Sequence, residues 1–88
     1  MLGDDGLAKK LRLMNLRQIA SVISNSWDVH PFALPYVNAM RALESMDDNY
    51  GADSARSIVT YFLGNAQRWH GNIARLVKIE LNYRLENR

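Results

Sequence analysis

Residues 53–66 read DSARSIVTYFLGNA, and this stretch decides the fold because its apolar side chains recur at helical spacing. Six of them follow the i, i+3, i+4 pattern without interruption: Ala55, Ile58, Val59, Phe62, Leu63 and Ala66. The polar side chains fall on the opposite side, so the pattern predicts an amphipathic helix with one buried face. Asp53 stands where its carboxylate can accept a backbone N–H of the first turn, and we expect it to be the N-cap.

Composition limits the class of protein. The chain has 88 residues, 48% of them hydrophobic and 23% charged, and it has no cysteine. These values predict one ordered domain over residues 1–88 with a thin core, without disulfides or thiolate metal sites. No apolar run approaches the roughly 20 residues of a membrane span, and Asp4 and Asp5 precede Lys9 and Lys10, the reverse of a signal peptide. We therefore expect a soluble, cytoplasmic protein.

The pattern before this stretch predicts a first helix over about residues 5–24. Its apolar stripe changes phase at Asn15: the members before it are Leu7, Leu11 and Met14, and those after it are Leu16, Ile19, Ala20 and Ile23. One long helix, straight or bent, is the favoured interpretation. The alternative is a short basic helix that ends near Asn15, followed by a second helix.

An irregular connection follows over residues 27–34, because His30 and Leu34 each precede a proline. This loop is unusually apolar, with Trp27, Val29, Phe32 and Leu34. We expect it to cover the helices as a lid, and the alternative is a partner-binding patch. Pro35 then suits the first position of a helix that runs to about Met46. The acidic turn over residues 47–51 lacks the ligand spacing of a calcium loop.

A last helix is predicted over about residues 73–86, with a break at Gly71 and a cap from Asn72. Its core stripe is Ile73, Leu76, Val77 and Leu81. Glu80 and Arg84 fall within the apolar arc, and their i, i+4 spacing allows an ion pair. Either the helix outruns the core beyond Val77, or this end meets a second subunit through Ile79, Tyr83 and Leu85. Together, the elements predict a compact all-α fold of four helices with one irregular apolar loop.

Charge is unevenly distributed along the chain. The net charge is +2, but basic residues outnumber acidic ones in residues 1–17 and 56–88, and acidic residues outnumber basic ones between them. One set of residues has the chemistry of a phosphate or acidic-partner contact: Arg56, Arg68, Trp69, His70, Arg75 and Lys78. The alternatives are that the opposite charges neutralise one another within the fold or across a dimer, and that Trp69 belongs to the core.

The chain lacks the residues of a recognisable catalytic or metal site. It has two histidines, and neither has a second histidine at i, i+3 or i, i+4. There is also no glycine-rich phosphate loop and no nucleophile motif. We therefore assign no catalytic residue, no metal and no cofactor, and we expect a protein that is not an enzyme.

The segment over residues 50–81, YGADSARSIVTYFLGNAQRWHGNIARLVKIEL, resembles small helical proteins encoded by bacteriophages and other mobile elements. The resemblance covers just over a third of the chain and carries no ligand residues. It implies a compact protein that binds host or viral macromolecules, as transcription regulators and inhibitors of host defence do. The first expectation is thus a homodimeric inhibitor or modulator that occupies a host or viral protein surface. The alternative is a nucleic-acid-binding regulator.

Overall fold

The computed structural model describes residues 2–87, and its organising helix is α4, Ala55–Gly64. The predicted buried face is confirmed, because four side chains of this helix are buried: Ala55, Ile58, Val59 and Phe62. The N-cap prediction is wrong. The Ser54 hydroxyl, and not Asp53, accepts the backbone N–H of Ser57 at 3.1 Å.

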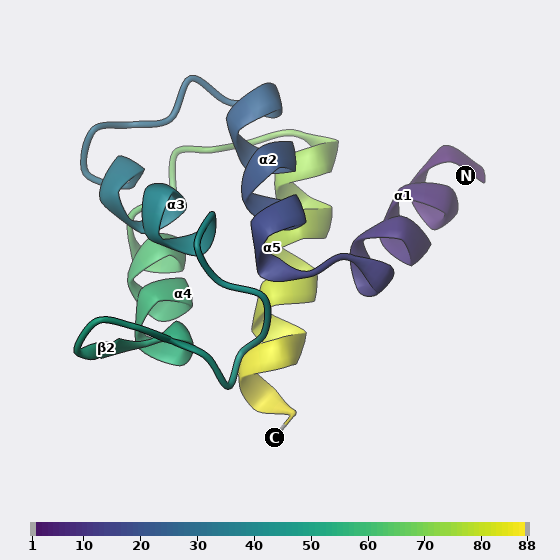
Figure 1. The fold of residues 1–88 in the computed structure, drawn as a ribbon. Helices are drawn as coiled ribbons and strands as arrows, with labels where there is room; N and C mark the ends of the chain where they lie inside the picture. The colour runs from purple at the N-terminus through teal and green to yellow at the C-terminus, as the bar shows by residue number, and fades with distance from the viewer. Residues whose placement is uncertain (1, 88) are drawn as a thin grey trace.

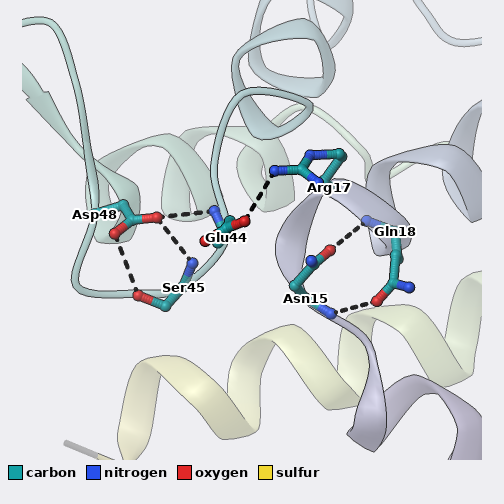
Figure 2. Close-up of polar contacts among 6 residues, drawn as sticks. All are labelled: Asn15, Arg17, Gln18, Glu44, Ser45 and Asp48. Carbon is teal, nitrogen blue, oxygen red and sulfur yellow. Dashed lines mark hydrogen bonds and ion pairs between the residues drawn. The ribbon is translucent and has the colours of Figure 1, made fainter.

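The N-terminal part of the chain forms two helices, α1 (Leu2–Leu13) and α2 (Leu16–Ser26), so the favoured single helix over residues 5–24 is wrong and the alternative is confirmed. Asn15 separates the two helices because its backbone is extended. Its Oδ1 accepts the Gln18 N–H at 2.9 Å, and the Gln18 Oε1 accepts the Asn15 N–H at 2.9 Å (Figure 2). This reciprocal capping box begins α2.

Helix α3 spans Leu34–Met40, with Pro35 in its first turn as predicted. It ends about six residues before the predicted end at Met46. Asp48 organises the segment that follows: its Oδ2 accepts the backbone N–H groups of Glu44 at 2.8 Å and of Ser45 at 3.1 Å (Figure 2). These bonds to the ionised form lower the pKa of the Asp48 carboxyl. The chain therefore turns where the apolar pattern would have allowed the helix to continue.

A small antiparallel hairpin precedes α4 and was not predicted. Its strands are β1 (Asn49–Tyr50) and β2 (Asp53–Ser54), with Tyr50 opposite Asp53. Gly51 is the first residue of the two-residue turn and has a φ of 61°, which favours glycine. The fold of residues 2–87 is thus mostly helical, but it has five helices and a two-stranded sheet instead of four helices alone.

Helix α5 spans Asn72–Glu86 and begins after Gly71, whose φ is 108°. The predicted break at Gly71 is confirmed, but the predicted cap position is wrong, because Gly71 is the N-cap residue and Asn72 is the first residue of the helix. Leu81 is fully buried, so the helix does not outrun the core beyond Val77. Ile73, which was assigned to the core stripe, is exposed instead.

Helices α2 to α5 surround most of the core, and α1 lies to one side of them (Figure 1), where it contacts α5 and adds the buried Leu11 to the core. The Trp27 ring stacks on Trp69 with 5.4 Å between ring centroids, and Trp69 also meets Phe62 edge to face at 6.4 Å. The predicted lid is therefore confirmed for Trp27 and Val29, which pack against the core. It is wrong for Phe32 and Leu34, which are exposed.

Candidate interaction surfaces

The six residues of the predicted basic contact do not form one exposed cluster. The Arg56 Nη1 donates to the Leu85 carbonyl at 2.9 Å near one end of α5, and the Lys78 Nζ donates to the Trp69 carbonyl at 2.7 Å near the other end. Trp69 is buried, so its ring cannot stack on a nucleic-acid base while it remains in the core. Burial also lowers the pKa of Lys78. The exposed members of the set are Arg68, His70 and Arg75.

The predicted ion pair on α5 is confirmed, and it has a further role that the sequence did not indicate. The Arg84 Nε donates to the Glu80 Oε2 at 2.7 Å, with both side chains largely buried. The Arg84 Nη2 donates to the carbonyl oxygens of Leu11 at 2.9 Å and Met14 at 2.7 Å. A guanidinium is well suited to the last carbonyl groups of a helix. Arg84 therefore fastens the end of α1 to α5.

The outer side of α5 carries two large exposed apolar side chains, Ile79 at 55% and Tyr83 at 56% exposure. They separate two hollows. The first, of about 260 Å³, lies between α1 and α5 and is lined by Ala8, Arg12, Leu76, Ile79, Glu80 and Tyr83. The second, of about 480 Å³, is lined by Arg75, Lys78, Ile79, Asn82, Tyr83 and Glu86. We call this surface the α5 ridge.

Leu85 does not belong to the α5 ridge, although the sequence grouped it with Ile79 and Tyr83. Its side chain is partly buried and packs against the core. The helical periodicity could not separate these residues, because all three lie outside the predicted core stripe. The α5 ridge therefore consists of Ile79 and Tyr83 with the polar residues beside them, which are Arg75, Lys78, Asn82 and Glu86.

A second exposed apolar surface combines residues from the loop, α3, the hairpin and α4. We call it the aromatic face, and its members are the exposed Phe32, Leu34, Tyr50 and Tyr61 and the partly buried Tyr36. Phe32 is 72% exposed and Tyr61 is 56% exposed. Two hollows follow one another along α4, because Tyr61 lines the first and Asn65, one turn later, lines the second.

The first of these hollows, of about 370 Å³, is the tyrosine pocket. Its lining residues are Pro35, Tyr36, Ala39, Tyr50, Asp53, Ile58 and Tyr61. The rings of Tyr36 and Tyr61 lie 5.7 Å apart at an angle of 32°. Sequence reasoning missed this site because Tyr36, Tyr50 and Tyr61 lie far apart in the chain, and no local pattern indicated that their side chains would line one pocket.

Among the side chains that the structure describes, those of residues 6–87, there is no cluster of three or more His, Cys, Asp or Glu that could hold a metal ion. In this part of the chain, no helix combines the length and the apolar character needed to cross a bilayer. In comparisons with protein-family models, curated proteins and solved structures, none matched this chain. The α5 ridge and the aromatic face are the two candidate interaction surfaces of the described chain.

Proposed function

We propose that this protein is a non-enzymatic binding protein that occupies the surface of a protein partner and so inhibits or modulates it. The observation that supports this function is the exposed aromatic face. Exposed apolar patches of this kind mark interaction sites, and aromatic residues are enriched where interfaces derive most of their binding energy. The partner is a host or viral protein of the cytoplasm, and the resemblance of residues 50–81 supports a phage or mobile element as the source.

Residue chemistry supports a binding role over an enzymatic one. The hollows on the aromatic face contain one histidine, His30, and its Nδ1 accepts the Phe32 backbone N–H at 3.1 Å. In the described residues, the Glu80 carboxylate beside the α5 ridge forms an ion pair with Arg84. Neither surface pairs a nucleophile with a base, which is the arrangement that acyl or phosphoryl transfer requires.

Capture from a lysate of the native host tests the proposal. The wild-type chain and a Phe32→Ser, Tyr61→Ser variant are used as paired baits, with circular dichroism to show that both remain helical. We expect one host or viral protein to be retained by the wild type and lost with the variant, because both side chains are exposed. A Lys9→Ser, Lys10→Ser bait, changed at two exposed residues of α1 that line neither surface, is the matched control and should retain the partner. Equal capture by the wild type and the aromatic variant would contradict the proposal.

The alternative function, a nucleic-acid-binding regulator, has one observation in its favour. Residues 54–79 contain no acidic residue, and Arg68, His70 and Arg75 are exposed within them. Mobility shift with generic duplex DNA at low and high salt tests this alternative, since binding driven by phosphate contacts weakens steeply with salt. Loss of binding in the Arg75→Glu, Lys78→Glu variant would support it. Absence of binding by the wild type at low salt would remove it.

We also infer that the chain forms a homodimer through the α5 ridge. Arg75 and Glu86 lie toward opposite ends of this surface, with Ile79 and Tyr83 between them. If two α5 helices met antiparallel about a two-fold axis, Ile79 would face Tyr83 of the partner subunit. The same alignment would place Arg75 opposite Glu86 of the partner subunit. Apolar contact and charge complementarity thus favour the same arrangement, as a self-complementary interface requires.

A further inference from the structure

The tyrosine pocket has aromatic walls, an apolar floor and a single charge. Tyr50 and Tyr61 are about half exposed, whereas Ala39 and Ile58 are buried and form the floor. Asp53 is the one ionisable residue of the lining besides the three tyrosines. At about 370 Å³ the hollow lies at the small end of the range for ligand sites, roughly 300 to 1,000 Å³. It is therefore suited to one long side chain of a partner.

The charge at this pocket is negative and is not neutralised within the described chain. In residues 2–87, the Asp53 carboxylate makes no hydrogen bond and no ion pair. The chain has no lysine or arginine between Arg41 and Arg56, and it has four acidic residues there: Glu44, Asp47, Asp48 and Asp53. Arg41 donates to the Ser24 hydroxyl at 2.6 Å, and Arg56 donates to the Leu85 carbonyl. Both flanking guanidinium groups are thus held elsewhere, and the pocket attracts a cation.

A neutral or anionic occupant fits this pocket less well. An apolar side chain that filled it would remove water from the Asp53 carboxylate without giving it a partner, which is costly. An anion bound in this pocket would need free backbone N–H groups at the start of α4 as hydrogen-bond donors. Two of the N–H groups there are already used, since Ala55 N–H donates to the Asp48 carbonyl at 2.9 Å and Ser57 N–H donates to the Ser54 hydroxyl. The occupant should therefore be a cation with an extended apolar stem.

We propose that the tyrosine pocket binds an arginine side chain of the protein partner, an inference that rests on the proposed binding function. A guanidinium is flat, so it can stack on the ring of Tyr36, Tyr50 or Tyr61 while it donates two parallel hydrogen bonds to the Asp53 carboxylate. The aliphatic stem of arginine covers the apolar floor. A lysine ammonium is more strongly hydrated and stacks less well, so it is the poorer fit.

Peptide titration followed by NMR tests the pocket directly. Isotope-labelled protein is titrated to millimolar concentrations with a blocked Gly-Arg-Gly peptide, and in parallel with Gly-citrulline-Gly and Gly-Lys-Gly. Citrulline keeps the shape of arginine but has no charge. We expect saturable shifts at Tyr36, Tyr50, Asp53 and Tyr61 with the arginine peptide, and affinity at least about tenfold lower for citrulline, because a charged pair is lost. Equal binding of citrulline, or tighter binding of lysine, would overturn the assignment.

Two variants connect any binding to this pocket. Asp53→Asn keeps the size of the side chain and leaves the Ser54 cap of α4 intact, and it should weaken arginine binding by about three- to tenfold. The matched control is Asp47→Asn, an exposed acid of the same segment that does not line the pocket, and it should bind as the wild type does. Unchanged binding in Asp53→Asn, or saturable shifts elsewhere on the protein, would refute the proposal.

The titration is independent of the partner, so its outcome can be separated from that of the proposed function. If the arginine peptide does not bind but a partner is still captured through the aromatic face, the proposed function stands and the arginine assignment is wrong. If the arginine peptide binds with the expected dependence on Asp53 but no partner is captured, the pocket assignment stands and the proposed function fails.

Discussion

At the scale of single residues, Arg84 joins parts of the chain that lie about seventy residues apart. It pairs with Glu80 and donates to the carbonyl oxygens of Leu11 and Met14. Arg84→Met should lower the free energy of unfolding by about 3 kcal/mol, because it leaves the largely buried Glu80 carboxylate without its partner. Urea denaturation measures this loss.

The control for Arg84 is the double variant Glu80→Met, Arg84→Met. It removes both charges and fills the same space with apolar atoms, so it should be more stable than Arg84→Met alone. If the single and double variants unfold at the same urea concentration, then the Glu80 charge is not the source of the loss. The anchoring of α1 would then depend on the carbonyl contacts instead.

Phe62 is the largest fully buried side chain of the core. Phe62→Ala should lower the free energy of unfolding by about 3 to 5 kcal/mol, because it removes apolar contacts and leaves a cavity. That is a large share of the stability available to a domain of this size. Tyr61→Ala, at an exposed position on the same helix, should cost about 1 kcal/mol or less. Thermal melts of the two variants decide the matter, and similar melting temperatures would show that the buried face of α4 is misplaced.

At the scale of elements, sequence reasoning succeeded where one pattern extended over a whole helix. The apolar spacing of residues 55–66 predicted the buried face of α4, because all six apolar residues of the stripe keep the same helical spacing. It failed at boundaries, which depend on a few local hydrogen bonds. Asn15 ends one helix and begins the next through its own side chain, and Asp48 captures two amides beyond α3. Neither set of hydrogen bonds changes the apolar pattern on which the prediction was based.

The capping box of α2 yields a prediction at this scale. Asn15→Ala removes the acceptor for the Gln18 N–H and should lower the free energy of unfolding by about 1 kcal/mol. Asn25→Ala is the control, because this exposed residue lies in the last turn of α2, and it should change stability by less than about 0.5 kcal/mol. Chemical denaturation of both variants provides the comparison. A larger loss in Asn25→Ala would contradict the role given to Asn15.

At the scale of the whole molecule, the candidate surfaces depend on contacts between distant segments. The sequence indicated that the loop over residues 27–34 was either a lid or a partner-binding patch, and the fold packs one part of this loop against the core and leaves the other part exposed. Trp27 is held by stacking on Trp69, whereas Phe32 is left exposed. The tyrosine pocket draws on α3, the hairpin and α4. No local pattern could have predicted a site of this kind, because its parts come together only through tertiary packing.

The prediction for the whole molecule is that it self-associates through the α5 ridge. Large exposed apolar patches are uncommon on monomers, and the α5 ridge exposes the large side chains of Ile79 and Tyr83. We expect sedimentation equilibrium at micromolar concentration to give twice the 10.1 kDa mass of the chain. Ile79→Asp together with Tyr83→Asp should produce monomers, since an antiparallel α5 pair would bring two such carboxylates together at each contact.

Two controls separate the α5 ridge from other surfaces. Ile73→Asp places the same charge on an exposed position of α5 that lines neither hollow, and Phe32→Ser with Tyr61→Ser alters the aromatic face. Both should remain dimeric. Leu85 is unsuitable for this test because it packs against the core, so its replacement by a charged residue would destabilise the fold itself. A wild type that sediments at the mass of one chain would refute the dimer. A dimer that persists in the Ile79→Asp, Tyr83→Asp variant would place the interface elsewhere, with the aromatic face as the next surface to test.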